Sequence, residues 1–274
     1  MSDYGQRIIA LVGLYVTLAV SLNLINGITG QFSIGHAAFY QVGAYFSGFI
    51  SVTYYKASPI QGLPWLLLMV LVGGIGAAIA GFVVGLPSLR LKGDYLAIVT
   101  MGFGEIMQDT LRNLEVITKG TQSINPLPDP SFFGVSFDST NYIAWYYLLL
   151  GFLALVVLLN YNVEQSRVGR AWVSIREDEL AASCMGIDPM KTKLLAFAVG
   201  AAVCSLAGAL WACYLDSTSE PGNYDFQISA LALCIVIVGG MGNIAGVLVG
   251  AVVMAGFNSI LLVKLAALVP QSSE

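Results

Sequence analysis

Charged side chains are scarce in the apolar stretches of this chain, and one helical face gathers three of them. Glu105, Asp109 and Arg112 follow one another at steps of four and three residues, a spacing that places side chains on one side of a helix. Ionisable groups are costly within a membrane-spanning helix, so they usually face a cavity, a solute pathway or one another. We expect Asp109 and Arg112 to pair near the helix end, and we take Glu105 and Asp109 as candidates for contact with a translocated solute.

A second candidate for a solute pathway contains the one histidine of the chain. The run from Gly27 to Phe39, GITGQFSIGHAAF, is too rich in glycine and polar groups for a continuous helix that faces lipid. Non-helical backbone survives at membrane depth only where protein or a water-filled cavity satisfies its polar groups. We therefore expect a broken or re-entrant segment, in which Gln31 and Ser33 are pathway candidates. His36 is either a hydrogen-bonded packing residue or a ligand of the solute.

The only long charged segment, residues 164–193, holds five of the twelve Lys and Arg residues and five of the sixteen acids. Such a density of charge in an apolar chain indicates a loop in water beside a membrane. The loop either is a solvated connector that fixes topology or is a docking surface for a cytoplasmic partner.

Two short helices are predicted within this loop. The first is amphipathic, because apolar residues recur at steps of three and four at Val168, Ala171, Trp172 and Ile175. The second is expected from Glu179 to Met185, with Asp178 as its N-cap and Gly186 as its stop. Asp188 and Pro189 then restart the chain as the N-cap and the first residue of the next membrane helix.

The composition excludes most soluble classes of protein, since 57% of residues are hydrophobic, 10% are charged and the mean hydropathy is +0.79. It predicts an all-α membrane bundle of about eight spans in a single domain, residues 1–274. We expect the first apolar run to be a retained span rather than a cleaved signal peptide, because no cleavage site follows it. Glycine and alanine crowd the third span, which should pack closely on another helix. The expected spans are 8–25, 37–53, 64–86, 94–114, 142–160, 194–214, 226–238 and 244–268.

The loop at 164–193 also sets the expected orientation. With this loop in the cytoplasm, Arg90 and Lys92 lie there too, and the proline-rich stretch after Glu115 forms an irregular exposed loop outside. Eight crossings would leave both termini outside. The glycine-rich interruptions at 27–36 and 239–246 are typical of paired broken segments that flank a translocation site.

The chain shows no signs of an enzyme. It has no phosphate-binding Gly-x-x-x-x-Gly-Lys-Ser/Thr motif, no paired nucleophile and base, and no cluster with metal-ligand spacing. We expect the four cysteines to behave as small hydrophobic residues. No cofactor, metal or nucleic acid is expected, and a chain that moves solute uphill must then receive its energy from a partner.

Three motifs resemble one family. Residues 175–186, IREDELAASCMG, resemble the cytoplasmic signature of ABC importer permeases, Glu-Ala-Ala followed three residues later by Gly. Leu180 stands where the signature has Glu, and Glu179 lies one place earlier. The runs GQFSIGHAAF (30–39) and KGDYLAIVTMGFGEI (92–106) are similar to branched-chain amino acid permeases of the LivM type.

This resemblance implies a permease subunit of an ATP-driven importer in a bacterial inner membrane, for branched-chain or other small neutral amino acids. Urea or short-chain amides are alternative cargoes, and an ion-coupled secondary transporter that uses Glu105 and Asp109 is a different class. The implied partners are two ABC ATPase subunits, a second similar permease, an extracytoplasmic solute-binding protein and the lipid bilayer. The residues expected to couple to the ATPase are Arg176, Glu177, Asp178, Glu179, Ala181, Ala182 and Gly186. The pathway candidates are Gln31, Ser33, His36, Tyr95, Glu105 and Asp109.

Overall fold

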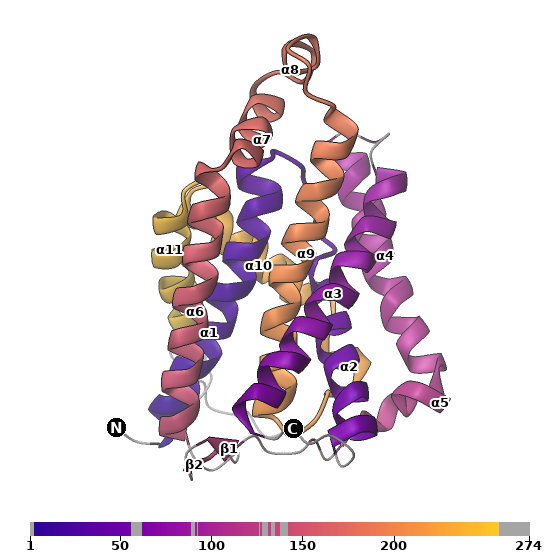
Figure 1. The fold of residues 1–274 in the computed structure, drawn as a ribbon, viewed down its shortest axis with the longest axis vertical. Helices are drawn as coiled ribbons and strands as arrows, with labels where there is room; N and C mark the ends of the chain where they lie inside the picture. The colour runs from indigo at the N-terminus through magenta and orange to yellow at the C-terminus, as the bar shows by residue number, and fades with distance from the viewer. Residues whose placement is uncertain are drawn as a thin grey trace, which may run out of the picture.

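The computed structural model describes residues 3–55, 62–88, 91, 93–125, 127, 131–132, 135–137 and 142–257. These residues form an elongated bundle of membrane helices, with two short helices at one end and a small two-stranded β-pair at the other (Figure 1). The helices are α1 Asp3–Asn23, α2 His36–Tyr54, α3 Leu63–Ser88, α4 Asp94–Asn113, α5 Glu115–Thr118, α6 Tyr142–Gln165, α7 Arg167–Glu177, α8 Glu179–Cys184, α9 Pro189–Tyr214, α10 Phe226–Gly239 and α11 Ile244–Gly256. The strands are β1 Ser131–Phe132 and β2 Val135–Ser136.

The central helix of the bundle is α9, which runs the length of the molecule (Figure 1). Small residues let its neighbours approach closely. A Cβ atom added at Gly208 would lie 1.9 Å from the carbonyl oxygen of Tyr40 in α2, and one at Gly81 in α3 would lie 2.7 Å from the Cβ of Ala201. The expected close packing of the third span is therefore confirmed, and α9 is its partner.

The expected break in the helical structure between the first two spans is confirmed. The chain leaves α1 through a π-helical turn, Leu24–Ile28, and stays non-helical until α2 begins at His36. The non-helical residues 29–35, called the extended segment below, descend into the bundle, and α2 fills only the half of the molecule opposite α8 (Figure 1). Non-helical chain and α2 thus follow one another along the length of the bundle.

The expected count of eight spans is not confirmed. Among the described residues, five helical segments are long and apolar enough to cross a membrane, and Ile244–Gly256 is a shorter apolar helix. The segments expected at 37–53 and 94–114 do form α2 and α4, but serine, glycine, tyrosine and charged residues keep these two helices outside that set. The end of the span expected at 244–268 lies outside the described residues, as do Arg90 and Lys92.

The expectation of an exposed loop after Glu115 is wrong in part. The helix α5 and a short 3-10 turn, Gly120–Gln122, occupy its start, and Ile124 and Leu127 are buried. The amide of Thr218 donates to the carbonyl of Ile124 (3.1 Å) and the amide of Leu127 donates to that of Asp216 (2.9 Å). These bonds fold the loop onto the segment that follows α9, a long-range pairing that local periodicity cannot reveal.

Candidate functional site

The charged segment forms α7, which lies beside the first turns of α9, and α8, which projects beyond the membrane helices at one end of the molecule (Figure 1). The side-chain oxygen of Ser166 begins α7 by accepting hydrogen bonds from the amides of Val168 and Gly169, both 3.2 Å. The predicted apolar face is confirmed, because Trp172 is fully buried and Ile175 is buried. The indole of Trp172 also donates to the carbonyl of Thr192 in α9 (2.9 Å), so α7 is bonded to the base of the central helix.

The helix α8 is closed at both ends, as the sequence predicts. Asp178 caps its start by accepting from the amides of Leu180 (2.8 Å) and Ala181 (3.1 Å). At its end Gly186 takes a positive φ of 86°, and the amide of Ile187 donates to the carbonyl of Ala182 over 3.1 Å. This 6→1 bond with a left-handed glycine is the Schellman arrangement that satisfies the last carbonyls of a helix. The helix ends at Cys184, one residue before the predicted Met185.

The exposed surface of α8 is partly apolar. Ala182 is buried against the rest of the loop, whereas Leu180 and Met185 are 78% and 83% exposed. Large apolar side chains that stand open at the end of a membrane protein, next to Glu177 and Asp178, are typical of a surface that another protein covers. The arrangement can therefore bind a partner while its own backbone groups remain satisfied.

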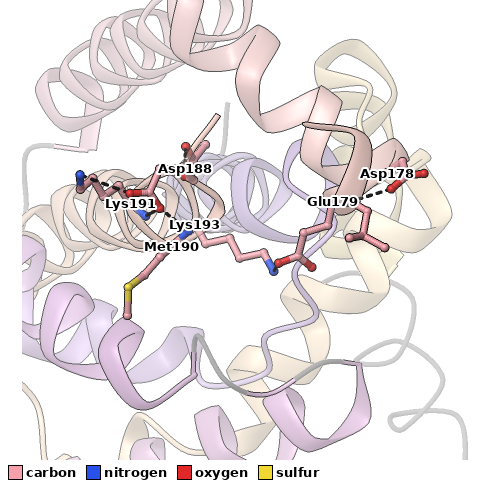
Figure 2. A network of polar contacts seen from close by, with 8 residues as sticks. Asp178, Glu179, Asp188, Met190, Lys191 and Lys193 are labelled. Carbon is pink, nitrogen blue, oxygen red and sulfur yellow. Dashed lines mark hydrogen bonds and ion pairs between the residues drawn. The ribbon is translucent and has the colours of Figure 1, made fainter. Parts of the chain in front are cut away.

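A polar network joins α8 to α9 (Figure 2). The ammonium of Lys193 donates to the carboxylate of Glu179 over 2.7 Å. Asp188 caps α9 by accepting from the amides of Met190 (3.0 Å) and Lys191 (3.3 Å), and it pairs with the Lys191 ammonium at 3.2 Å. The hydrogen bond from the Lys191 amide is the main reason that the pKa of Asp188 lies below its usual value. The cap therefore stays ionised at neutral pH.

The two glycine-rich interruptions meet beneath α7. The amide of Gly242, in the turn between α10 and α11, donates to the side-chain oxygen of Asn23 over 2.8 Å. The guanidinium of Arg176 donates to the carbonyl of Gly27 over 2.6 Å. The segments that the sequence paired as broken elements are thus neighbours, on the side of the molecule that carries the charged loop.

The pathway candidates on the extended segment are buried. Gln31 is 6% exposed, and Ser33 and His36 are fully buried. The side-chain amide of Asn26 makes two hydrogen bonds to the backbone of Ser33. It donates to the Ser33 carbonyl (3.1 Å) and accepts from the Ser33 amide (3.2 Å). The His36 ring bonds to the hydroxyl of Ser21 through Nε2 at 2.7 Å.

The start of α2 is fastened to two other helices. The amide of Ile34 donates to the hydroxyl of Thr100 in α4 (3.1 Å), and the amide of Ala37 donates to the hydroxyl of Ser229 in α10 (2.8 Å). A Cβ atom at Gly35 would lie 1.9 Å from the carbonyl oxygen of Thr100. The extended segment, α4 and α10 are therefore in direct contact near the middle of the bundle.

The candidates on α4 lie on its outer side. Tyr95 is 72% exposed, and Glu105 and Asp109 are exposed too. The predicted pair is confirmed, since Asp109 and Arg112 lie 3.7 Å apart. Gln108 points the other way and donates to the carbonyl of Pro221 over 2.8 Å.

Glu105 shares a small cavity with the start of α2. The cavity is also lined by Gly35, Asp225, Phe226 and Ser229. Two acidic residues, Glu105 and Asp225, an apolar side chain and the N-terminal end of α2, where the helix dipole is positive, thus adjoin one another. The structure thereby brings Glu105 next to the end of the extended segment, and Tyr95 does not line this cavity.

Sequence reasoning missed several residues that fasten the site. Asn23, Thr100 and Ser229 are polar residues of membrane helices that take part in long-range hydrogen bonds, and Asn26 bonds to Ser33 within the same loop. Their polarity within apolar stretches was a usable signal, because an unpaired polar group is expensive there. Within the part of the chain that the structure describes, no group of three His, Cys, Asp or Glu residues could hold a metal ion.

Comparison with known proteins gives one consistent result. Residues 6–272 match the family described as branched-chain amino acid transport system, permease component. The chain is 36% identical to the high-affinity branched-chain amino acid transport permease protein LivM of Salmonella typhimurium, over 88% of this chain and 60% of the relative. It is 35% identical to LivM of Escherichia coli, over 90% of this chain and 61% of the relative.

A probable LivM of Methanocaldococcus jannaschii is 30% identical, over 90% of this chain and 78% of the relative. The chain thus spans about three fifths of the length of the two bacterial LivM proteins. No solved structure matches it.

Proposed function

Because this chain belongs to the family of branched-chain amino acid transport permeases, we propose that it is a transmembrane subunit of an ATP-driven importer for branched-chain amino acids. The chain is a multi-pass membrane protein of a transport family rather than an enzyme. The proposal adds the energy source, the cargo, the partners and a location in the bacterial inner membrane.

One observation carries the proposal: the helix α8, which is capped at both ends, lies at the tip of a charged loop between two membrane helices (Figure 1). A solvated connector has no need of a helix that is capped by Asp178, ended by a left-handed Gly186 and tied to α9 by Lys193. A rigid helix with exposed apolar residues fits a partner that both binds to it and moves it. We assign the coupling role to this helix and its flanks, residues 176–186.

The partner that binds there supplies the ATP hydrolysis. The chain has no phosphate-binding motif of its own, and a closing ATPase can only do work on the membrane helices through a rigid contact. Two ATPase subunits, one for each permease of a pair, suit this arrangement. The charged loop then lies in the cytoplasm, and the end with α5 and the β-pair faces the solute-binding protein.

The outer side of α4 is the surface proposed to face a second, similar permease. Glu105 and Asp109 are exposed there, and carboxylates that face acyl chains are strongly disfavoured. A pathway between the two permeases would place Glu105 next to the solute, beside the start of α2. An ammonium group of an amino acid is the complementary charge.

The test is reconstitution of the chain with its partner permease, ATPases and solute-binding protein in vesicles. We expect uptake of labelled leucine that requires enclosed ATP, and no uptake driven by an ion gradient alone. Urea and short amides serve as competitors and should not displace leucine. Leucine uptake by the chain alone in an ion gradient, or uptake of urea in place of leucine, would contradict the proposal.

A further inference from the structure

Arg176 is an exposed residue near the end of α7, and its guanidinium reaches the end of the first membrane helix. Its Nη1 donates to the carbonyl of Gly27 over 2.6 Å, across 149 residues of chain. Gly27 belongs to the π-helical turn that ends α1. The last carbonyls of a helix lack partners within the helix, and a cation is favourable there. Arg176 therefore caps the first membrane helix from a different element.

The aliphatic part of the same side chain packs on the extended segment. A Cβ atom built on Gly30 would lie 2.9 Å from Cγ of Arg176 and 3.3 Å from its Cβ. Gly30 also takes a positive φ of 71°, so both space and conformation favour glycine. The backbone at the start of residues 29–35 rests directly on the Arg176 stem.

The guanidinium contacts the second glycine turn as well. A Cβ atom on Gly242 would lie 2.7 Å from Nη1 of Arg176, and one on Gly27 would lie 2.4 Å from the Gly242 amide nitrogen. The Gly242 amide itself is bonded to Asn23 in α1. Arg176 thus occupies the point at which α7, the end of α1 and the α10–α11 turn come together.

The contacts continue from this point to the pathway candidates. The extended segment that begins at Gly30 leads to Ile34, which bonds to Thr100 of α4, and to Ala37, which bonds to Ser229 of α10. Glu105 lies on α4 and shares a cavity with these elements. A shift of α7 would therefore reach the middle of the bundle through one side chain and a short run of extended backbone.

We infer that Arg176 is a positioning residue that transmits displacement of α7 to the extended segment 29–35, and does not itself bind the ATPase. The inference rests on the proposed function, in which α8 receives the movement. It changes the role of Arg176, which the sequence motif places among the ATPase contacts. Its hydrogen bond to Gly27 and its packing on Gly30 assign it to the membrane side of the loop.

Arg170 provides a matched control. It lies on the same helix, it is exposed, and its Nη1 also donates to a backbone carbonyl, that of Gln165 at 2.9 Å. That carbonyl belongs to the end of α6, next to the loop, and not to either glycine turn. Arg170→Met thus removes the same chemistry without the proposed link.

The first experiment uses the complete transporter in vesicles. Arg176→Met should retain the ATPase subunits and their ATP hydrolysis, while solute moved per ATP falls about tenfold, as expected for loss of a charge-assisted hydrogen bond. Arg176→Lys keeps the positive charge and a hydrogen-bond donor, so its transport per ATP should lie between that of Arg176→Met and the wild type. Transport per ATP in Arg170→Met should match the wild type. Loss of the ATPase subunits from Arg176→Met alone, or unchanged transport per ATP, would overturn the inference.

The second experiment needs no transport and covers the case in which Arg176→Met does not assemble. Amide hydrogen exchange is measured on the full chain with its partners, for the wild type, Arg176→Lys and Arg170→Lys. We expect exchange in residues 27–35 to be faster in Arg176→Lys only, because the cap of α1 is weakened. Equal exchange in all three proteins would overturn the inference. Failure of the proposed function is a separate outcome, which would show in the first experiment as absence of leucine uptake by the wild type.

Discussion

Lys193 and Glu179 form a hydrogen-bonded ion pair of 2.7 Å that joins the first turn of α8 to the beginning of α9 (Figure 2). The pair is sheltered, since the lysine side chain is 12% exposed and that of the glutamate 33%. Partial shelter reduces screening by salt and limits the motion of both side chains. The contact therefore fixes the orientation of α8, the proposed docking helix for the ATPase, relative to α9.

The first prediction concerns this pair. In a double-mutant cycle of Glu179→Gln and Lys193→Met, the two changes should not be additive, with a coupling energy of about 0.5–1 kcal/mol in the free energy of unfolding. The measurement is thermal unfolding of the purified complex at low and high salt. Because the pair is not fully buried, the coupling should shrink at high salt, and strict additivity at both salt concentrations would rule the link out.

The second prediction concerns the cap of α8. Asp178→Ala removes the acceptor for the amides of Leu180 and Ala181, which should destabilise the helix by about 1 kcal/mol. Asp178→Asn is the control, because asparagine caps helices equally well. Amide exchange at these two residues should rise in the alanine variant and stay low in the asparagine variant; equal protection in both would mean that the cap is unimportant.

The third prediction separates solute contact from packing at Glu105. The side chain is exposed and lines the cavity at the start of α2, so Glu105→Gln should reduce uptake and leave thermal stability unchanged. Asp109→Asn is the comparison on the same helix, since its carboxylate pairs with Arg112 at the surface and such pairs contribute little. Lower stability without a transport defect in Glu105→Gln would assign Glu105 a structural role.

The local parts of the charged loop could be predicted from sequence. Asp178, Gly186, Asp188 and Pro189 act within a few residues of chain, so their caps and stops follow from side-chain chemistry alone. The boundaries of α8 were correct to one residue. The amphipathic face of α7 was also correct, because Trp172 sets the helix orientation by burial.

Long-range relationships could not be predicted in this way. Nothing near Arg176 in the sequence indicates that its partner is a carbonyl 149 residues away. The burial of Ile124 likewise depends on pairing with residues near Thr218. The count of eight spans is not confirmed for a different reason. The helices α2 and α4 form where spans were expected, but they are less apolar than the five candidate spans, and the end of the last expected span lies outside the described residues.

The fourth prediction uses the end of α8. A Cβ atom at Gly186 would meet no atom within 4 Å, so a substitution there changes backbone conformation without steric overlap. The positive φ of 86° disfavours a β-branched residue by about 1–2 kcal/mol, whereas asparagine tolerates the left-handed region. Gly186→Val should misdirect the docking helix, and Gly186→Asn should largely preserve it.

The most direct test of coupling through this loop compares these two variants in the complete transporter. Leucine uptake and leucine-stimulated ATP hydrolysis are measured together in vesicles, with insertion of the membrane helices checked by the yield of assembled complex. We predict about tenfold lower uptake in Gly186→Val, the size expected from a penalty of this order, and near-normal uptake in Gly186→Asn. Full uptake and full stimulation of ATP hydrolysis in Gly186→Val would contradict the account, because the loop would then be only a connector.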